Sequence, residues 1–234
     1  MSRQAVVLAG GLATRMRPMT EHTPKVLLDV AGRPFVDWLL ERLRGCGYDE
    51  VVLSIGRLGR LVREHVGDGS RVGVRVVYSD EGDDQLGTAG ALRFALPHLA
   101  PTFLVTYGDS YLPFDYASPL DELRAHEDCD GVMSVFANAN QWDASNVVTD
   151  GVWVRRYEKG TKDPAFDHID YGALALRRGV IAKLPEGSRG GLDVIQRELA
   201  ATNRLRAVVA RDRFFEIGSP EGHSTLVKHL EGRT

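Results

Sequence analysis

The sequence has few cysteines, no long apolar run and no surplus of either charge. Its 234 residues include only Cys46 and Cys129, which fit neither a disulfide framework nor a metal-binding CxxC pair. No apolar stretch approaches the ~20 residues that a membrane span requires. A formal net charge of −3 provides no overall positive field for nucleic acid or an anionic membrane. These absences predict a reduced, cytoplasmic protein with neither nucleic-acid nor membrane partners.

The first half of the chain alternates short β-branched runs with helical patterns. With 43% hydrophobic and 26% charged residues, the composition is that of a globular protein, and the length favours one domain. Phe35, Leu39 and Leu43 recur at a spacing of four, which predicts the buried stripe of a helix. Alternation of this kind is typical of parallel α/β units. We predict strands at 4–8, 51–55, 74–78, 103–106 and 132–136, and helices at 34–44, 58–66, 90–96 and 119–126.

The pattern changes after about residue 138. Two β-rich runs between Asn146 and Val154 flank Asp150-Gly151, a strong signal for a hairpin. We predict further strands at 171–176, 206–209 and 214–216, with helices at 192–201 and 220–230. The second half therefore resembles an antiparallel elaboration of the same domain.

The loop after the first predicted strand concentrates features suited to phosphate. Gly10 and Gly11 let the backbone approach a ligand and turn N–H groups toward it. Arg15, Arg17 and Lys25 add three cations at the carboxyl edge of the expected sheet, where open α/β folds bind ligands. Neither a P-loop nor a G-x-G-x-x-G dinucleotide motif is present. The alternative is a tight strand exit with solvated cations.

The complete string decides between these interpretations. The segment 8–18 reads L-A-G-G-x-x-x-R-x-x-P and is followed by Pro24-Lys25, a pattern that resembles the sugar-1-phosphate nucleotidylyltransferases. The resemblance is greatest to small enzymes such as heptose 1-phosphate guanylyltransferase and N-acetylmuramate 1-phosphate uridylyltransferase. It implies a Rossmann-like α/β fold: a mixed, mainly parallel sheet with helices on both faces and a small antiparallel sugar-binding elaboration. It also implies one domain over 1–234, with nucleotide-binding residues in about 1–137, the sugar-phosphate elaboration in 138–220 and a terminal helix at 220–230.

The same resemblance implies the nucleotide-binding residues. The segment 85–92, Q-L-G-T-A-G-A-L, is similar to the family's L-G-T-[AG]-[GA], which reads the base. By itself it also fits a helix start framed by Gly87 and Gly90, with Thr88 as the cap. The implied set is Leu8, Ala9, Gly10, Gly11, Arg15, Gln85, Gly87 and Thr88.

Two carboxylates are implied to bind Mg²⁺, which prefers one or two carboxylates plus phosphate oxygens. Asp109 ends a buried strand in a Tyr-Gly-Asp sequence, similar to the family's N-G-D, and Tyr107 replaces the asparagine. Glu216 lies in E-x-G-S-P-E, where the family has aspartate. A capping role for Asp109 in a turn is the alternative.

The sugar 1-phosphate is implied to contact the second half of the chain. Glu158-Lys159 resembles a family E-K pair, although such a pair is often only a solvated strand edge. Asp170 replaces a sugar-contacting asparagine, and the loop containing Trp142 faces the sugar in this interpretation. The implied sugar-phosphate residues are Gly108, Asn146, Glu158, Lys159, Tyr171 and Gly172.

In the implied reaction, a sugar-phosphate oxygen attacks the α-phosphorus of a nucleoside triphosphate in line and releases pyrophosphate. Arg15, Lys25 and Asp109 are the implied catalytic residues, in a monomer or homodimer. GTP is the favoured donor, with UTP or dTTP as alternatives, and a heptose or hexose 1-phosphate is the favoured acceptor. A cytidylyltransferase for a non-sugar phosphate and a non-catalytic NDP-sugar sensor stay open. A glycosyltransferase is disfavoured because Asp109-Ser110-Tyr111 lacks the second Asp of a D-x-D motif.

Overall fold

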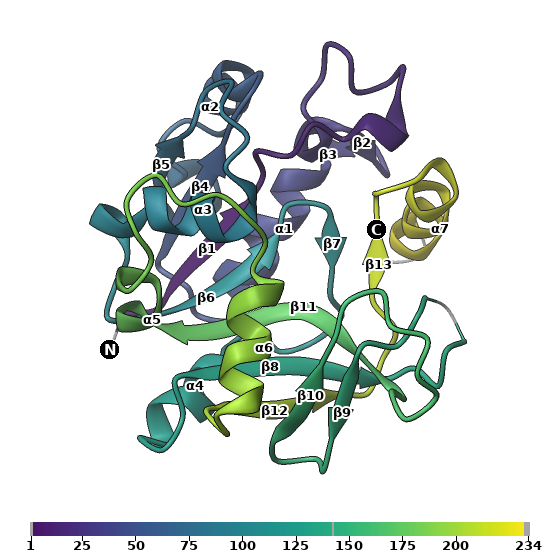
Figure 1. The fold of residues 1–234 in the computed structure, drawn as a ribbon. Helices are drawn as coiled ribbons and strands as arrows, with labels where there is room; N and C mark the ends of the chain where they lie inside the picture. Colours follow the sequence, from purple (N-terminus) through teal and green to yellow (C-terminus); the bar gives the residue numbers. More distant parts are fainter. Residues whose placement is uncertain (1, 142, 232–234) are drawn as a thin grey trace.

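The computed structural model describes residues 2–141 and 143–231, which are built around a nine-stranded sheet (Figure 1). The strand order is β10-β9-β11-β6-β1-β4-β5, and β8 joins β11 and β12 outside this path. The strands are β1 (Gln4–Leu8), β4 (Glu50–Ile55), β5 (Arg75–Asp80), β6 (Thr102–Tyr107), β8 (Gly131–Ala137), β9 (Val147–Thr149), β10 (Val154–Tyr157), β11 (His168–Arg177) and β12 (Leu205–Ala210). Every strand predicted in the first half is present.

The sheet combines parallel and antiparallel pairing, as the sequence predicts. The block β6-β1-β4-β5 is parallel, and β12 runs parallel to β8. In contrast, β11 is antiparallel to β6, β8 and β9, and β9 is antiparallel to β10. The prediction of a mixed sheet with helices is confirmed. The antiparallel part is centred on β11, which is long enough to pair with β6 and β8 at once.

Helices cover both faces of the sheet, as predicted. Successive strand residues point to opposite faces, so Ala5 and Val7 pack in one core and Val6 in the other. The first core includes residues of α1 (Phe35–Gly45), α2 (Gly59–Val66), α4 (Ala117–Ala125) and α7 (Pro220–Glu231). The second includes residues of α3 (Gly87–Phe94), α5 (Arg178–Ala182) and α6 (Asp193–Ala201). Two buried layers therefore hold the parallel strands rigid from both sides.

Helix α1 confirms the predicted stripe, because Phe35, Leu39 and Leu43 are all fully buried. Helix α3 departs from the prediction and begins three residues early, at Gly87. Thr88 is not its cap, since the Oγ1 atom of Thr88 accepts a hydrogen bond from the backbone N–H of Leu192 at 2.8 Å. A Cβ built on Gly87 would lie 2.5 Å from the carbonyl oxygen of Gly190. The start of α3 is thus set by its contact with the 188–192 segment.

The sequence did not predict two short ribbons, β2 (Asp29–Val30) with β3 (Arg33–Pro34) and β7 (Ser110–Tyr111) with β13 (Phe215–Glu216), although β13 itself lies in a predicted strand. Two-residue strands carry too little periodicity to be read from sequence. Within the described ranges, no helix is long and apolar enough to cross a membrane.

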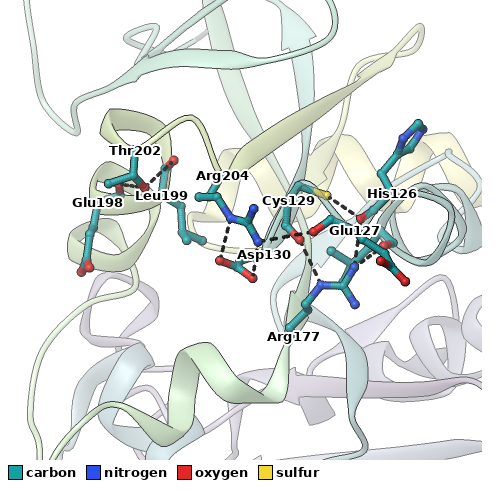
Figure 2. A network of polar contacts seen from close by, with 10 residues as sticks. His126, Glu127, Cys129, Asp130, Arg177, Glu198, Leu199, Thr202 and Arg204 are labelled. Carbon is teal, nitrogen blue, oxygen red and sulfur yellow. Dashed lines mark hydrogen bonds and ion pairs between the residues drawn. The ribbon is translucent and has the colours of Figure 1, made fainter.

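A polar network connects the residues just before β8 and β12 with the end of β11 (Figure 2). The Arg204 guanidinium donates to both carboxylate oxygens of Asp130, at 2.9 and 3.1 Å, and lowers the pKa of Asp130. Arg177 donates to the carbonyl oxygens of Leu123, His126 and Cys129. Cys129 and Cys46 are both free thiols. Charged hydrogen bonds from Arg177 therefore satisfy carbonyl groups at the end of α4, and no disulfide links this region.

Candidate active site

A cavity of about 260 Å³ opens where β6, β1, β4 and β5 present their carboxyl ends. Because these strands are parallel, the loops that follow them meet at one edge of the sheet. The structure brings ten of the predicted site residues into the lining of this cavity. They are Leu8, Ala9, Gly10, Gly11, Lys25, Gln85, Gly87, Thr88, Gly108 and Asp109.

The loop after β1 is fixed by backbone hydrogen bonds to both neighbouring strands. Ala9 N–H donates to the carbonyl of Ser54 at 2.8 Å, and Gly108 N–H donates to that of Leu8 at 2.9 Å. The two glycines serve different purposes. A Cβ on Gly10 would lie 2.5 Å from the Oε1 atom of Glu81, whereas a Cβ on Gly11 would meet no atom within 4 Å. Gly10 makes room for Glu81, and Gly11 leaves its backbone open to the cavity.

Gly108 is predicted to contact the sugar phosphate, but it lies in the wall of this cavity. A Cβ there would lie 2.8 Å from Cγ1 of Val26 and 3.0 Å from the carbonyl oxygen of Leu8. We expect Gly108→Ala to push the Lys25 segment away from β1, costing about 1–3 kcal/mol of stability and raising the KM for nucleotide. Thermal unfolding and steady-state kinetics measure both effects. Gly45→Ala is the control, because its Cβ would meet no atom within 4 Å; equal behaviour of the two variants would contradict the prediction.

Lys25 and Asp109 form an ion pair at the edge of the cavity. The Nζ atom of Lys25 lies 2.8 Å from Oδ2 of Asp109, although the residues are 84 positions apart. Lys25 begins a short 3₁₀ turn, Lys25–Leu27, and Asp109 lies just beyond Gly108, the residue that follows β6. Both side chains retain some solvent access, at 16% and 29% exposed. A phosphate entering the cavity would meet a cation already held in place.

Asp109 and Glu216 converge through the β7/β13 ribbon. Glu216 is paired with Ser110, and the N–H of Ile217 donates to the carbonyl of Asp109 at 2.8 Å. Water reaches Glu216, but the surrounding protein desolvates it and, together with the charges of Asp109 and Asp143, raises its pKa to about 7. Arg15 and Lys25 oppose this rise. Two mutually repelling carboxylates make a site where a cation would be stabilised.

This pair fits Mg²⁺ that shares its ligands with a substrate. The described ranges contain no group of three or more His, Cys, Asp or Glu side chains placed to hold a metal by themselves. Mg²⁺ commonly uses one or two carboxylates and fills the remaining positions with phosphate oxygens and water. Asp109 and Glu216 would therefore hold the ion jointly with bound phosphates.

The raised pKa of Glu216 has a consequence for stability. A carboxyl whose pKa is about 7 in the folded state and lower in the unfolded state makes folding less favourable as the pH rises through that interval. We expect Glu216→Gln, measured without metal or nucleotide, to raise the melting temperature at pH 8. The gain should shrink toward zero at pH 4, where the carboxyl is protonated in both states. Melting curves across this range measure it, and a gain independent of pH would contradict the assignment.

Arg15 lies outside the cavity lining but beside the carboxylates. It is exposed on the turn Thr14–Met16, and its Nη2 atom lies 3.4 Å from where a Cβ of Gly218 would be. Arg15, Lys25, Asp109 and Glu216 thus form one charged cluster next to the glycine-rich loop.

The predicted sugar-phosphate residues form a second group near β9, β10 and β11. Asn146 accepts from Glu158 N–H through its carbonyl at 2.9 Å and from Asp170 N–H through Oδ1 at 2.8 Å. Lys159 is exposed in the turn after β10 and acts electrostatically on the enclosed Asp170, whose pKa burial raises. Hydrogen bonds thus bring Asn146, Glu158 and Asp170 together, and of the predicted sugar-phosphate residues only Gly108 lines the cavity. Gly172 follows at a φ of +99°, a conformation that favours glycine.

Tyr171 does not join this group, contrary to the prediction. It is 1% exposed, and its ring makes edge contacts with Phe114 and Phe214. Successive side chains of a strand point to opposite faces of the sheet, so Tyr171 points away from the face that its neighbour Asp170 takes, and it packs in the core. Trp142 lies outside the described residues.

Three lining residues with polar side-chain groups were not among the predicted site residues: Ser54, Glu81 and Tyr107. Glu81 follows β5 immediately, and Asp109 follows β6 after one intervening residue, Gly108. The predicted strand at 74–78 could have pointed to Glu81, because polar residues just after parallel strands come together at the carboxyl edge of the sheet.

Together, the doubly covered sheet and the cavity define an α/β protein with a crevice, lined by a glycine-rich loop and a lysine, at the carboxyl ends of its parallel strands. A match to the family described as "Nucleotidyl transferase" extends over residues 4–231. The chain belongs to this family, and it is a sugar-1-phosphate nucleotidylyltransferase.

Three relatives illustrate the likeness. N-acetylmuramate alpha-1-phosphate uridylyltransferase of Neisseria meningitidis is 45% identical over 192 residues, covering 74% of this chain and 80% of the relative. D-glycero-alpha-D-manno-heptose 1-phosphate guanylyltransferase of Campylobacter jejuni is 25% identical over 223 residues, covering 94% and 96%. The crystal structure of HddC from Yersinia pseudotuberculosis complexed with GMP-PN has a TM-score of 0.79 at 25% identity, covering 97% and 99%.

Proposed function

We propose that this protein transfers the uridylyl group of UTP to N-acetylmuramate α-1-phosphate or a related amino-sugar 1-phosphate. The observation that carries the proposal is the 45% identity to a uridylyltransferase of that substrate. The sequence alone favoured GTP, and the comparisons support the UTP alternative better. Transfer to a heptose 1-phosphate from GTP is the second candidate, supported by 25% identity to a guanylyltransferase over nearly its whole length.

In this proposal the nucleotide phosphates lie against the Gly10-Gly11 loop, where backbone N–H groups can face them. Lys25 neutralises charge between the α-phosphate and the incoming sugar phosphate. Arg15, exposed beside the loop, clamps the outer phosphates and stabilises the departing pyrophosphate. The sugar-phosphate oxygen forms a new bond to the α-phosphorus as the bond to the β-phosphate oxygen breaks. No general base is required, because the attacking phosphate is already ionised.

Enzymes of this family typically use Mg²⁺. When bound, the ion supplies positive charge that brings two anionic phosphates together. Asp109 and Glu216 would hold it, which their convergence favours. In the second half of the chain, Lys159 would position the sugar phosphate, and Asn146 and Glu158 would contact the sugar.

A matrix of nucleotides and acceptors tests the proposal. UTP, GTP, dTTP, CTP and ATP are each combined with the 1-phosphates of N-acetylmuramate, N-acetylglucosamine, glucose, mannose and heptose, and pyrophosphate release is measured. We expect the UTP and N-acetylmuramate 1-phosphate pair to have the highest kcat/KM. A maximum for GTP with the heptose 1-phosphate would select the second candidate, and nucleotide binding without any release would indicate a sensor.

A further inference from the structure

Gln196 is a buried amide of α6 that has no part in the reaction described so far. It is 1% exposed, and its Nε2 atom donates to Oδ2 of Asp170 at 2.7 Å. Its Oε1 atom is buried and has no hydrogen-bond partner among the described residues. Leaving an enclosed acceptor unpaired is costly, so packing alone does not account for an amide at this position. What the amide provides is its donation to Asp170.

The carboxylate of Asp170 is held in one orientation by a donor on each oxygen. Oδ1 accepts from the backbone N–H of Gly172 at 3.0 Å, and Oδ2 accepts from Gln196. The residue is half-buried, and its own backbone N–H donates to Oδ1 of Asn146 at 2.8 Å. An ionised carboxylate has about four acceptor positions and no donor, so two donors leave positions for the hydroxyl or amide N–H groups of a ligand. Asp170 is therefore an oriented acceptor.

Strand β11 is irregular where Asp170 lies. Its pairing with β8 shifts between Asp170 and Leu174, and Gly172 lies inside this irregularity. Bulges of this kind are common next to active sites, where they redirect a side chain. A Cβ built on Gly172 would lie 3.7 Å from Cδ2 of Tyr107, which lines the cavity. Burial, and after it the charge of Asp170, raises the pKa of Tyr107, and Lys159 acts electrostatically on Asp170. Asp170 is thus close to both the cavity wall and the predicted sugar-phosphate lysine.

The first turn of α6 is fixed to a segment that lines the cavity. The backbone N–H of Leu192 donates to Oγ1 of Thr88 at 2.8 Å, and Thr88 is a lining residue. Gly190 exchanges two further backbone hydrogen bonds with the same segment. Gln196 follows one helical turn later, and its N–H donates to the carbonyl of Leu192 at 2.9 Å. Groups held on helices and strands are placed more precisely than groups on loops. The amide of Gln196 is therefore held in a fixed place relative to the cavity.

We propose that Gln196 is a positioning residue for the sugar: it orients the carboxylate of Asp170 to accept hydrogen bonds from hydroxyl or amide N–H groups of the sugar 1-phosphate. This inference rests on the proposed function and extends it to a residue outside every motif. An asparagine at position 170 could turn either its oxygen or its nitrogen toward a sugar. Asp170 offers oxygens only, and Gln196 decides how they point.

Substitution of Gln196 by leucine tests the proposal. We expect Gln196→Leu to raise the KM for N-acetylmuramate 1-phosphate on the order of tenfold, about the loss of one hydrogen bond to a charged group, with kcat and the KM for UTP within about twofold of wild type. Leucine removes the unpaired oxygen and is of similar size, so we expect the variant to fold. Glu198→Gln, exposed on the same helix, is the matched control. An unchanged KM for the sugar, or an equal rise in both KM values, would overturn the proposal.

A reversal of the hydrogen bond gives a second test at constant net charge. Gln196→Glu alone sets two carboxylates against each other, and we expect it to lose both sugar affinity and melting temperature. In Gln196→Glu/Asp170→Asn the amide at position 170 donates to the carboxylate at position 196, and its oxygen can still accept from the sugar. We expect the KM for the sugar to return to within about threefold of wild type. A double variant that recovers its melting temperature but not its sugar KM would show that the contact is only structural.

Calorimetry separates this inference from the proposed function. UDP is compared with UDP-N-acetylmuramate, and GDP with GDP-mannose, so that the ratio of dissociation constants within a pair measures what the sugar adds. We expect Gln196→Leu to lower this ratio on the order of tenfold and to leave the affinity for the free nucleotide unchanged. A wild-type gain from GDP-mannose alone would count against uridylyl transfer, and the GDP pair would then decide the role of Gln196. A sugar contribution that survives in Gln196→Leu, or a wild type that gains nothing from either sugar, would overturn the inference.

Discussion

Lys25→Met should lower kcat on the order of 100- to 1000-fold, the usual cost of removing one preorganised electrostatic group from an active site. Methionine keeps most of the alkyl chain, so the substitution removes the charge with little change in packing against Val26. The loss arises because two anionic phosphates must approach each other beside the Lys25 ammonium, which its ion pair with Asp109 holds in place. Pyrophosphate release under saturating substrates measures kcat, and the melting temperature reports the fold.

We expect the charge of Lys25, and not the length of its side chain, to account for the loss of activity. Lys25→Ala should therefore lose about as much activity as Lys25→Met. Lys183→Ala, which removes an exposed lysine directly after α5, should turn over like the wild type. Near-wild-type turnover of Lys25→Met would show that the cation has no part in the chemical step.

Asp109→Asn should reduce turnover by a similar factor and weaken the apparent affinity for Mg²⁺. The carboxylate is the ion-pair partner of Lys25 at 2.8 Å and faces Glu216, so it contributes charge to both the cation and the metal site. Asparagine keeps the shape and removes that charge. A Mg²⁺ titration of activity measures the shift toward higher concentrations.

The double variant Lys25→Met/Asp109→Asn sharpens this second result. Because the two side chains are in contact, their effects should not add, and the double variant should lose much less than the product of the single losses. Fully multiplicative losses would mean that Lys25 and Asp109 act in separate steps. An unchanged Mg²⁺ requirement in Asp109→Asn would remove this residue from the metal site.

Periodicity was enough to predict most of the helices and strands. Strands such as β1 and β4 are apolar almost throughout because both of their faces are covered, and α1 shows its buried stripe at a spacing of four. Asp150-Gly151 correctly predicted the β9–β10 hairpin, in which Asp150 accepts hydrogen bonds from the N–H groups of Val152 and Trp153. The start of α3 was missed because a contact with Gly190, a hundred residues away, decides it.

The site was predictable only where its residues lie in consecutive motifs. The glycine-rich loop and the Asp109 strand end could be recognised locally, but Tyr171 was misplaced because adjacency to Asp170 and Gly172 does not say which face of β11 a side chain takes. Glu81 was missed because it belongs to no motif. It reaches the cavity only because β5 lies at the end of the parallel block.

The sequence by itself determined the family, the helices and strands, and the charged groups available for phosphate chemistry, since these depend on local pattern and residue type. Only the tertiary structure decided which of those groups meet. Lys25 and Asp109 are 84 positions apart, but they form an ion pair because their loops follow β1 and β6, which are neighbours in the sheet. Glu216 is brought to them by the pairing of β13 with β7. Distances between strands, which no local pattern contains, set the span of the cavity and give Gly10 and Glu81 their shared place in it.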